Sequence, residues 1–135
     1  MSPLGTYQDM RDSNPTALFG YVANELSRRH VAYLHVSEPI AGQGLVPGPR
    51  VTPVLREVFK GTLILSGGYT AQSANEALAE RAGDLVAFGI PFLANPDLPE
   101  RLAEGAPLNA PDFQTFYTAD AKGYTDYPLR PSRAA

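Results

Sequence analysis

The chain has 135 residues, of which 44% are hydrophobic and 19% are charged, a composition that fits one globular domain over residues 1–135. Its formal net charge of −3 offers no attraction to nucleic acid or to an anionic membrane, so neither is expected as a partner. Because cysteine is absent and there are only two histidines, disulfides and cysteine nucleophiles are excluded and a metal site is not expected.

The first predicted elements are a helix and a strand. Asn14 followed by Pro15 is typical of a helix N-terminus, and this helix is expected to end near Arg29. Its apolar face is expected to consist of Leu18, Val22 and Leu26. Residues 31–36 are a nearly continuous hydrophobic run, which predicts a strand covered on both faces.

A loop separates this strand from a second helix. Residues 40–50 contain three glycines and two prolines, which favour a loop. The second helix is expected to begin at Thr52, where a proline follows a good capping residue, and residues 62–65 are predicted to form the second strand. A glycine turn then leads into a third helix, predicted over residues 70–81.

The third strand is predicted over residues 85–88 and ends at a turn that contains Gly89. A helix capped by Asn95 and Pro96 is expected to run through residue 104, followed by an irregular tail. The longest apolar run, residues 85–94, is far shorter than the roughly 20 residues that span a bilayer. No leader pattern is found at the start, so we expect a cytosolic protein.

Three strands that alternate with helices predict a parallel α/β arrangement, either a slice of a barrel or a slice of an open sheet. Such a slice has two unpaired edges, and the strand faces at 31–36 and 85–88 lack an opposite wall. Leaving these side chains in water forfeits on the order of 10 kcal/mol, which is comparable with the stability of a whole domain. We therefore expect self-association or a second polypeptide that supplies the remaining part.

Glycine turns follow the second and third predicted strands, at Gly67 and Gly68 and at Gly89. Active sites of parallel barrels lie at the carboxyl ends of the strands, and a phosphate is often held by the loops after the last two. Glycine lets backbone N–H groups approach a phosphate without a Cβ in the way. On spacing alone, two ordinary strand-to-helix turns explain these glycines equally well.

Three titratable residues are weaker candidates. His35 lies within a predicted strand and is expected to be a core residue, and His30 lies at a helix end, where a cation offsets the helix dipole. Glu38 follows a strand and is therefore placed where a catalytic carboxylate could lie. A carboxylate at this position more commonly caps or pairs with a neighbouring loop, and both interpretations stay open.

Six segments resemble, in order and spacing, the C-terminal part of the Old Yellow Enzyme family of flavin-dependent ene-reductases. They are residues 2–7, 32–39, 66–70, 88–89, 94–98 and 123–128. The resemblance implies an FMN-binding (β/α)8 TIM barrel, of which this chain would hold the last three strands, their helices and a C-terminal tail. It also implies NAD(P)H as the reductant and an activated alkene as the substrate.

The resemblance assigns the FMN phosphate to the backbone at Gly67, Gly68 and Gly89. It places Phe116 beside the flavin ring and Tyr117 beside the substrate. These roles follow from matching positions and not from spacing.

Two departures from the family pattern affect this assignment. The arginine that pairs with the flavin phosphate is replaced by Ile90, which should weaken FMN binding. A second flavin-contacting arginine corresponds to Met1, and the substrate-activating pair and the proton-donating tyrosine of the family lie upstream of the matching region. We therefore expect an FMN-binding oxidoreductase segment that is incomplete and inactive alone. The alternative is a non-catalytic remnant or interaction module that binds no flavin.

Overall fold

The computed structural model describes residues 1–38, 50–118 and 120–131. The predicted loop over residues 40–50 lies outside the described residues, except for Arg50. The chain divides into two units, Met1–Ala87 and Phe88–Ala135, and each is described by itself.

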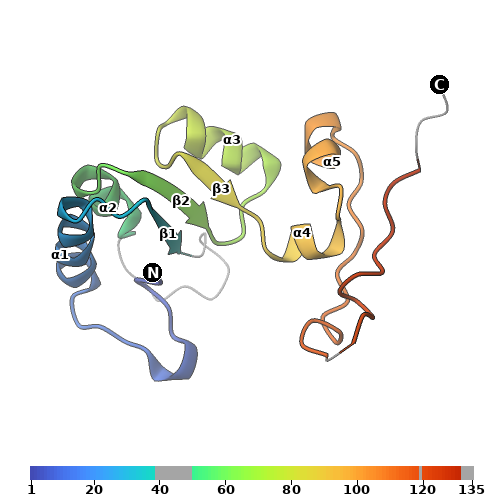
Figure 1. Ribbon diagram of the computed structural model, residues 1–135, viewed down its shortest axis with the longest axis horizontal. Helices are drawn as coiled ribbons and strands as arrows, with labels where there is room; N and C mark the ends of the chain where they lie inside the picture. The colour runs from blue at the N-terminus through green and yellow to red at the C-terminus, as the bar shows by residue number, and fades with distance from the viewer. Residues whose placement is uncertain (39–49, 119, 132–135) are drawn as a thin grey trace. The chain divides into compact units, whose positions relative to one another are not determined.

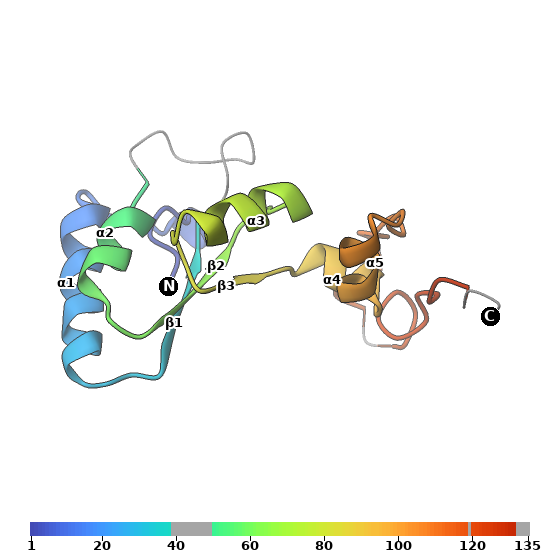
Figure 2. The same cartoon turned by 90° about the horizontal axis from the view of Figure 1, so that it is seen from above.

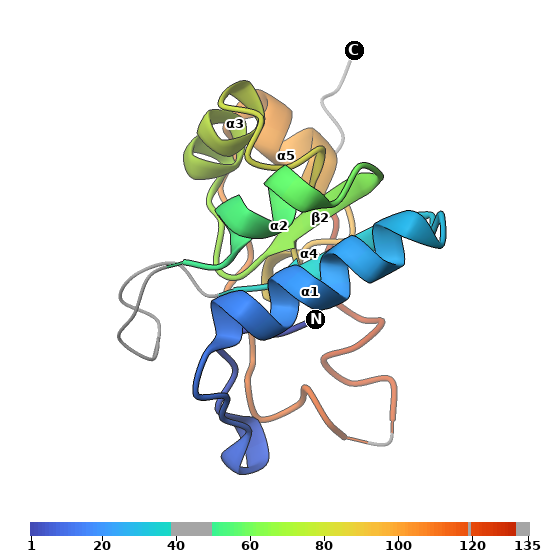
Figure 3. The ribbon, with the colours of Figure 1, turned by 90° about the vertical axis from the view of Figure 1, so that its left-hand side faces the viewer.

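A parallel sheet forms the centre of the first unit, with the described strands in the order β1-β2-β3. Its elements are η1 (Tyr7–Asp9), α1 (Pro15–Arg28), β1 (Tyr33–Ser37), α2 (Thr52–Val58), β2 (Thr62–Ser66), α3 (Ala71–Ala79) and β3 (Leu85–Ala87). Helices α1 and α2 lie side by side, and α3 packs against β3 (Figures 1, 2 and 3). The predicted parallel α/β arrangement is confirmed.

The two faces of the sheet differ in burial. Leu34 and Leu63 are paired in register on one face, and both are buried in the core. On the opposite face Tyr33 is 56% exposed and Leu85 is 53% exposed. The prediction that the first strand is covered on both faces is therefore wrong for the described residues, because the helices cover one face only. The absence of an opposite wall, also expected from the sequence, agrees with this pattern.

Met1 lies at the outer edge of β1. Its amino group donates to the carbonyl oxygen of His35 at 2.6 Å, and its own carbonyl oxygen accepts from the N–H of Ser37 at 2.9 Å. Two bonds that flank one residue of the neighbouring strand are the pattern of parallel pairing. The outer edge of β1 therefore has the geometry to accept a parallel strand.

Helices α1 and α3 begin with the predicted caps, whereas the N-cap of α2 is Val51, one residue before the expected cap Thr52. The side chain of Asn14 accepts from the N–H of Ala17, and Thr70 and Ser73 form a reciprocal capping box at the start of α3. The predicted apolar face of α1 is only partly correct, since Leu18 is 44% exposed. Gly20 is buried instead, and a Cβ added to it would lie 3.2 Å from Val54, so α1 approaches α2 closely through small residues.

The second unit contains two short helices, α4 (Ile90–Ala94) and α5 (Leu98–Glu104), followed by an irregular tail. Helix α4 was not predicted, and α5 begins after Asp97 rather than at Asn95. The reason is that the side chain of Asn95 bonds to Pro91 and Asn109 instead of capping a helix. Helix α5 ends as predicted, at Gly105 with a φ of 63°.

In the part of the chain that the structure describes, no helix has the length and apolar character needed to cross a membrane.

Candidate functional site

The turn after β2 contains two glycines in a conformation that side chains disfavour. Gly67 has a φ of 137° and Gly68 a φ of 82°. Both values lie in the region that residues with a Cβ rarely adopt, so this turn requires glycine. The turn follows the carboxyl end of a strand in a parallel sheet, as the sequence predicts. Because neither residue has a Cβ, the backbone N–H groups of this turn can be approached closely.

The turn before α4 differs in its physical basis. Gly89 has a φ of −81°, which any residue adopts, and a Cβ built on it meets nothing within 4 Å among the described residues. The conformation of Gly89 therefore does not require glycine, whereas the open space beside it is compatible with a ligand. The next side chain, Ile90, is 46% exposed and carries no charge that could pair with an anion.

The structure places these turns in different units. Gly67 and Gly68 are adjacent in the first unit, and Gly89 and Ile90 are adjacent in the second. The assignment of these four residues to one phosphate stays a prediction.

The aromatic residues assigned by resemblance lie in the tail of the second unit. The rings of Phe113 and Phe116 are 5.0 Å apart at an angle of 37°. Phe116 is half-buried, whereas Tyr117 is 98% exposed. The residue that precedes Phe116, Thr115, is buried, and its hydroxyl donates to the carbonyl oxygen of Asp112 at 2.9 Å, which fixes the turn. Tyr117 is therefore presented outward on an ordered turn, with its side chain available for contact.

Glu38 is a buried carboxylate at the end of β1, with 1% exposure. Its oxygens accept from the N–H of Val51 at 2.6 Å, from the N–H of Thr52 at 3.1 Å and from the Thr52 hydroxyl. The Nε of Arg50 lies 3.4 Å away. These bonds satisfy donors at the N-terminus of α2, so of the two interpretations left open by the sequence the structure favours capping.

The histidine predicted to be a core residue is exposed. His35 lies on the open face of β1, where its neighbours in register are Ile64 on β2 and then Leu85 on β3. Sequence reasoning missed this because alternation of burial along β1 was hidden by a continuous apolar run. His30 follows α1 with a φ of 54° and is exposed.

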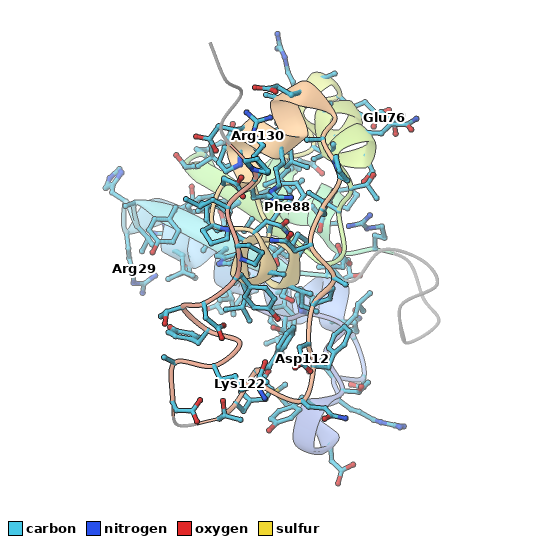
Figure 4. All side chains as sticks on the ribbon, turned by 90° about the vertical axis from the view of Figure 1, so that its right-hand side faces the viewer. Arg29, Glu76, Phe88, Asp112, Lys122 and Arg130 are labelled. Carbon is cyan, nitrogen blue, oxygen red and sulfur yellow. The ribbon has the colours of Figure 1, made fainter. Side chains whose placement is uncertain are left out.

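A cavity of about 480 Å³ is lined by residues of α2, of α3 and of the segments that flank them, among them Arg56, Tyr69 and Glu76, the last of which Figure 4 labels. Arg56 donates to the carboxylate of Asp84 and to two backbone carbonyls, so its guanidinium is already hydrogen-bonded to groups of the fold. Burial lowers the pKa of the nearby Arg50 guanidinium, but the side chains of Tyr69 and Glu38 raise that pKa above its ordinary value. Arg50 and Arg56 are therefore both bonded to carboxylates of the fold, Glu38 and Asp84.

Comparison with known proteins identifies the family. A model of the NADH:flavin oxidoreductase / NADH oxidase family matches residues 1–109. The 12-oxophytodienoate reductase-like protein of Solanum lycopersicum is 48% identical over 129 residues, which are 93% of this chain and 34% of that protein. The 12-oxophytodienoate reductase 2 of Arabidopsis thaliana is 44% identical, and the alignment covers 99% of this chain and 37% of that protein.

Comparison with solved structures identifies related proteins as well. Morphinone reductase matches with a TM-score of 0.87 and 46% identity, over 95% of this chain and 34% of that one. The Old Yellow Enzyme homologue from Zymomonas mobilis matches with a TM-score of 0.90 and 41% identity, over 95% of this chain and 37% of that one. The chain thus spans about a third of the length of the relatives it matches. It belongs to the NADH:flavin oxidoreductase / NADH oxidase family of FMN-dependent enzymes, and its fold is part of the TIM barrel of Old Yellow Enzyme proteins.

Proposed function

We propose that the chain supplies part of the FMN site of an NAD(P)H oxidoreductase of the ene-reductase type. When bound, FMN would supply hydride transfer from NAD(P)H to an activated alkene. The observation that carries the proposal is the turn at Gly67 and Gly68, whose positive φ values demand glycine at the carboxyl end of a strand. This turn stands in a chain whose fold matches an Old Yellow Enzyme homologue with a TM-score of 0.90.

Within this proposal the two glycines present backbone N–H groups to the phosphate of FMN. Gly89 would contribute by leaving open space for the phosphate, since a Cβ built there meets nothing within 4 Å among the described residues. Ile90 adds no charge, so the phosphate would be held by backbone dipoles rather than by a guanidinium. The proposed site is therefore weak for an anion.

Phe116 and Tyr117 are the proposed aromatic wall beside the flavin ring and the substrate. The ring of Phe116 is supported by Phe113, and Tyr117 is 98% exposed and able to contact a bound molecule. We propose no proton donor and no substrate-activating residue among the described residues, so turnover is not expected from this chain alone.

The open face of the sheet supports a proposal about the partner. Tyr33 and Leu85 each expose more than half of their surface on this face, and the outer edge of β1 accepts a parallel strand at Met1. A polypeptide that carries further parallel strands of the barrel would pair with this edge and cover this face. Self-association of the chain is the other way to bury the same surface.

A second candidate function is a non-catalytic interaction module that binds no flavin. Ile90 favours it, because the residue that would neutralise a phosphate is absent. The module would keep the sheet, with its open face, and the ordered tail.

Titration of FMN with the 135-residue chain, followed by flavin fluorescence, tests the proposal. We expect saturable binding that is weakened by Gly68→Ala, because the turn would be strained and a methyl group would enter the phosphate region. Gly105→Ala is the matched control, since Gly105 also has a positive φ of 63° but ends α5. Absence of binding at any FMN concentration, or equal weakening by both variants, would favour the interaction module.

A further inference from the structure

Three polar side chains of the second unit bond to the two ends of one tail segment. Asn95 has no exposed surface and Arg101 is 5% exposed, while Asn109 is half-buried. We call these three residues the polar latch. Buried polar groups are costly unless they are bonded, so a set this well satisfied makes its backbone partners hard to release.

The first half of the latch joins Asn95 to Asn109. The Oδ1 of Asn95 accepts from the N–H of Asn109 at 2.7 Å, and its Nδ2 donates to the carbonyl oxygen of Pro91 at 2.9 Å. The Nδ2 of Asn109 donates to the carbonyl oxygens of Ala94 and Pro128, each at 2.8 Å. Asn109 therefore ties the end of α4 to Pro128, which lies 19 positions beyond Asn109.

The second half of the latch is Arg101, whose guanidinium spreads over three acceptors. Its Nε donates to Asp97 at 2.7 Å, its Nη1 to the carbonyl oxygen of Pro107 at 2.6 Å and its Nη2 to that of Pro128 at 3.2 Å. The carbonyl oxygen of Pro128 thus accepts from both Arg101 and Asn109. The segment over residues 110–127 is thus held at both ends. Bonds to Pro107 and Asn109 hold the chain just before it, and bonds to Pro128 hold the chain just after it.

Arg130, two residues after Pro128, makes further bonds to the region of α5. Its N–H donates to the second carboxylate oxygen of Asp97 at 2.9 Å, and its guanidinium bonds to both oxygens of Glu104 at 2.5 and 2.7 Å. The hydrogen bond from Arg130 lowers the pKa of Asp97 and also that of Glu104. Figure 4 shows Arg130 beside α5, whereas Asp112 and Lys122 lie further from this helix.

Described residues between the two held ends are hydrogen-bonded to one another. The hydroxyl of Tyr127 accepts from the N–H of Asp112 at 2.8 Å, and the N–H of Gly123 donates to Asp126 at 2.7 Å. A loop with fixed ends loses less conformational entropy when its internal bonds form. Release of the ends should therefore loosen the interior, including Phe116 and Tyr117.

We propose that Asn95, Arg101 and Asn109 are positioning residues that close residues 110–127 into a loop and so fix the place of Phe116 and Tyr117. The closing of the loop stands on contacts within the second unit alone. The assignment of Phe116 and Tyr117 to flavin and substrate rests on the proposed function.

Limited trypsin digestion of the full chain tests the latch, because Lys122 lies inside the loop. Arg101 provides an internal reference in α5, and Arg130 precedes Pro131 and is protected from trypsin by that proline. Asn109→Asp keeps the shape of the side chain but replaces the donor to Ala94 and Pro128 with an acceptor. We expect cleavage after Lys122 to become about tenfold faster while cleavage after Arg101 is unchanged, because proteolysis reports the population of the open loop.

Asn75→Asp is the matched control, since Asn75 is an exposed asparagine on α3, in the first unit. Hydrogen exchange at Thr115 and Thr118, whose N–H groups form turn bonds in the loop, should accelerate in Asn109→Asp but not in Asn75→Asp. Equal cleavage after Lys122 in all three proteins would overturn the proposal. A parallel rise in cleavage after Arg101 would overturn it too, because the latch would then support the whole unit and not the loop.

FMN titration of the same proteins separates this proposal from the proposed function. Loop release by Asn109→Asp with no FMN binding in any protein supports the latch and counts against the flavin site. FMN binding that is unaffected by a demonstrated release of the loop would overturn the positioning of Phe116 and Tyr117 against the flavin.

Discussion

Replacement of Glu38 is expected to destabilise the first unit more than any exposed acidic substitution. This carboxylate is 1% exposed and serves as acceptor for two backbone N–H groups and one hydroxyl at the start of α2. Glu38→Ala removes every acceptor at once. Glu38→Gln keeps one oxygen and removes the negative charge from the helix N-terminus.

The magnitude follows from the donors left behind. The N–H groups of Val51 and Thr52 are buried with Glu38, and a buried donor without an acceptor costs about 1–3 kcal/mol. Glu38→Ala leaves both donors without an acceptor and should therefore cost about 2–6 kcal/mol. Glu38→Gln should cost about 1–2 kcal/mol, since one acceptor remains while the favourable interaction with the helix dipole is lost. Domains of this size are stable by about 5–15 kcal/mol, so the alanine variant should lose a large share of the total stability.

Urea unfolding followed by far-ultraviolet circular dichroism measures these losses. Glu57→Ala is the matched control, because Glu57 is an exposed acidic residue on α2, the helix that Glu38 caps. The expected order of unfolding midpoints is wild type and Glu57→Ala together, then Glu38→Gln, then Glu38→Ala. If Glu38→Ala unfolded at the wild-type midpoint, the capping role would be refuted, and a catalytic role for Glu38 would again need to be considered.

Four further predictions concern pH, flavin, turnover and association. Hydrogen bonds from Leu63 and Arg56 lower the pKa of Asp84, so its stabilisation is present above the ordinary carboxyl pKa and is lost as pH falls through the lowered value. Asp84→Asn should therefore flatten the loss of stability that unfolding experiments detect below about pH 4; an unchanged acid limb would contradict this. Ile90→Arg should tighten FMN binding by about tenfold to a hundredfold, and this gain in affinity should shrink as the salt concentration rises. If fluorescence titration gave equal affinities for the two proteins, residue 90 would not face the phosphate. The chain alone should not oxidise NADPH in the presence of an activated enone, and turnover that survives removal of host reductases would disprove this. Light scattering should detect oligomers or aggregates, whereas a monodisperse monomer with cooperative melting would show that the open face is tolerated in water.

The elements that were predicted well are those specified by neighbouring residues. Asn14 with Pro15 and Thr70 with Ser73 start helices through bonds that span three residues, so local sequence contains the whole signal. Gly105 ends α5 for a similar local reason, its positive φ. The parallel sheet also followed from the alternation of strands with helices, without any knowledge of distant contacts.

The errors arise where a distant residue determines the outcome. Asn95 looks like a helix cap in sequence, but its side chain bonds to Asn109, 14 residues away, and α5 begins later. Burial on both faces of β1 was predicted from apolarity, yet burial depends on what covers the strand. Glu38 could not be assigned from sequence because its acceptor role depends on residues 50–52, which the chain brings back to the end of β1.

The candidate site shows the same division. The need for glycine at 67 and 68 is a local backbone property, and the φ values agree with what a strand-to-helix turn of this kind requires. The roles of Phe116 and Tyr117 came from resemblance only, since no local pattern marks a tail aromatic as a ligand contact. The polar latch escaped sequence analysis altogether, because its three members are scattered over residues 95–109 and meet through backbone acceptors at Pro107 and Pro128.

Flavin binding and completion of the barrel are separate physical questions in this chain. Covering the exposed Tyr33 and Leu85 would add apolar burial and therefore stability, whatever lies at the glycine turns. An arginine at position 90 would add a charge-assisted bond to a phosphate and leave the open face as it is. A partner that stabilises the chain without raising its affinity for FMN would therefore favour the interaction module. An Ile90→Arg gain that appears only with the partner bound would favour a split flavin site.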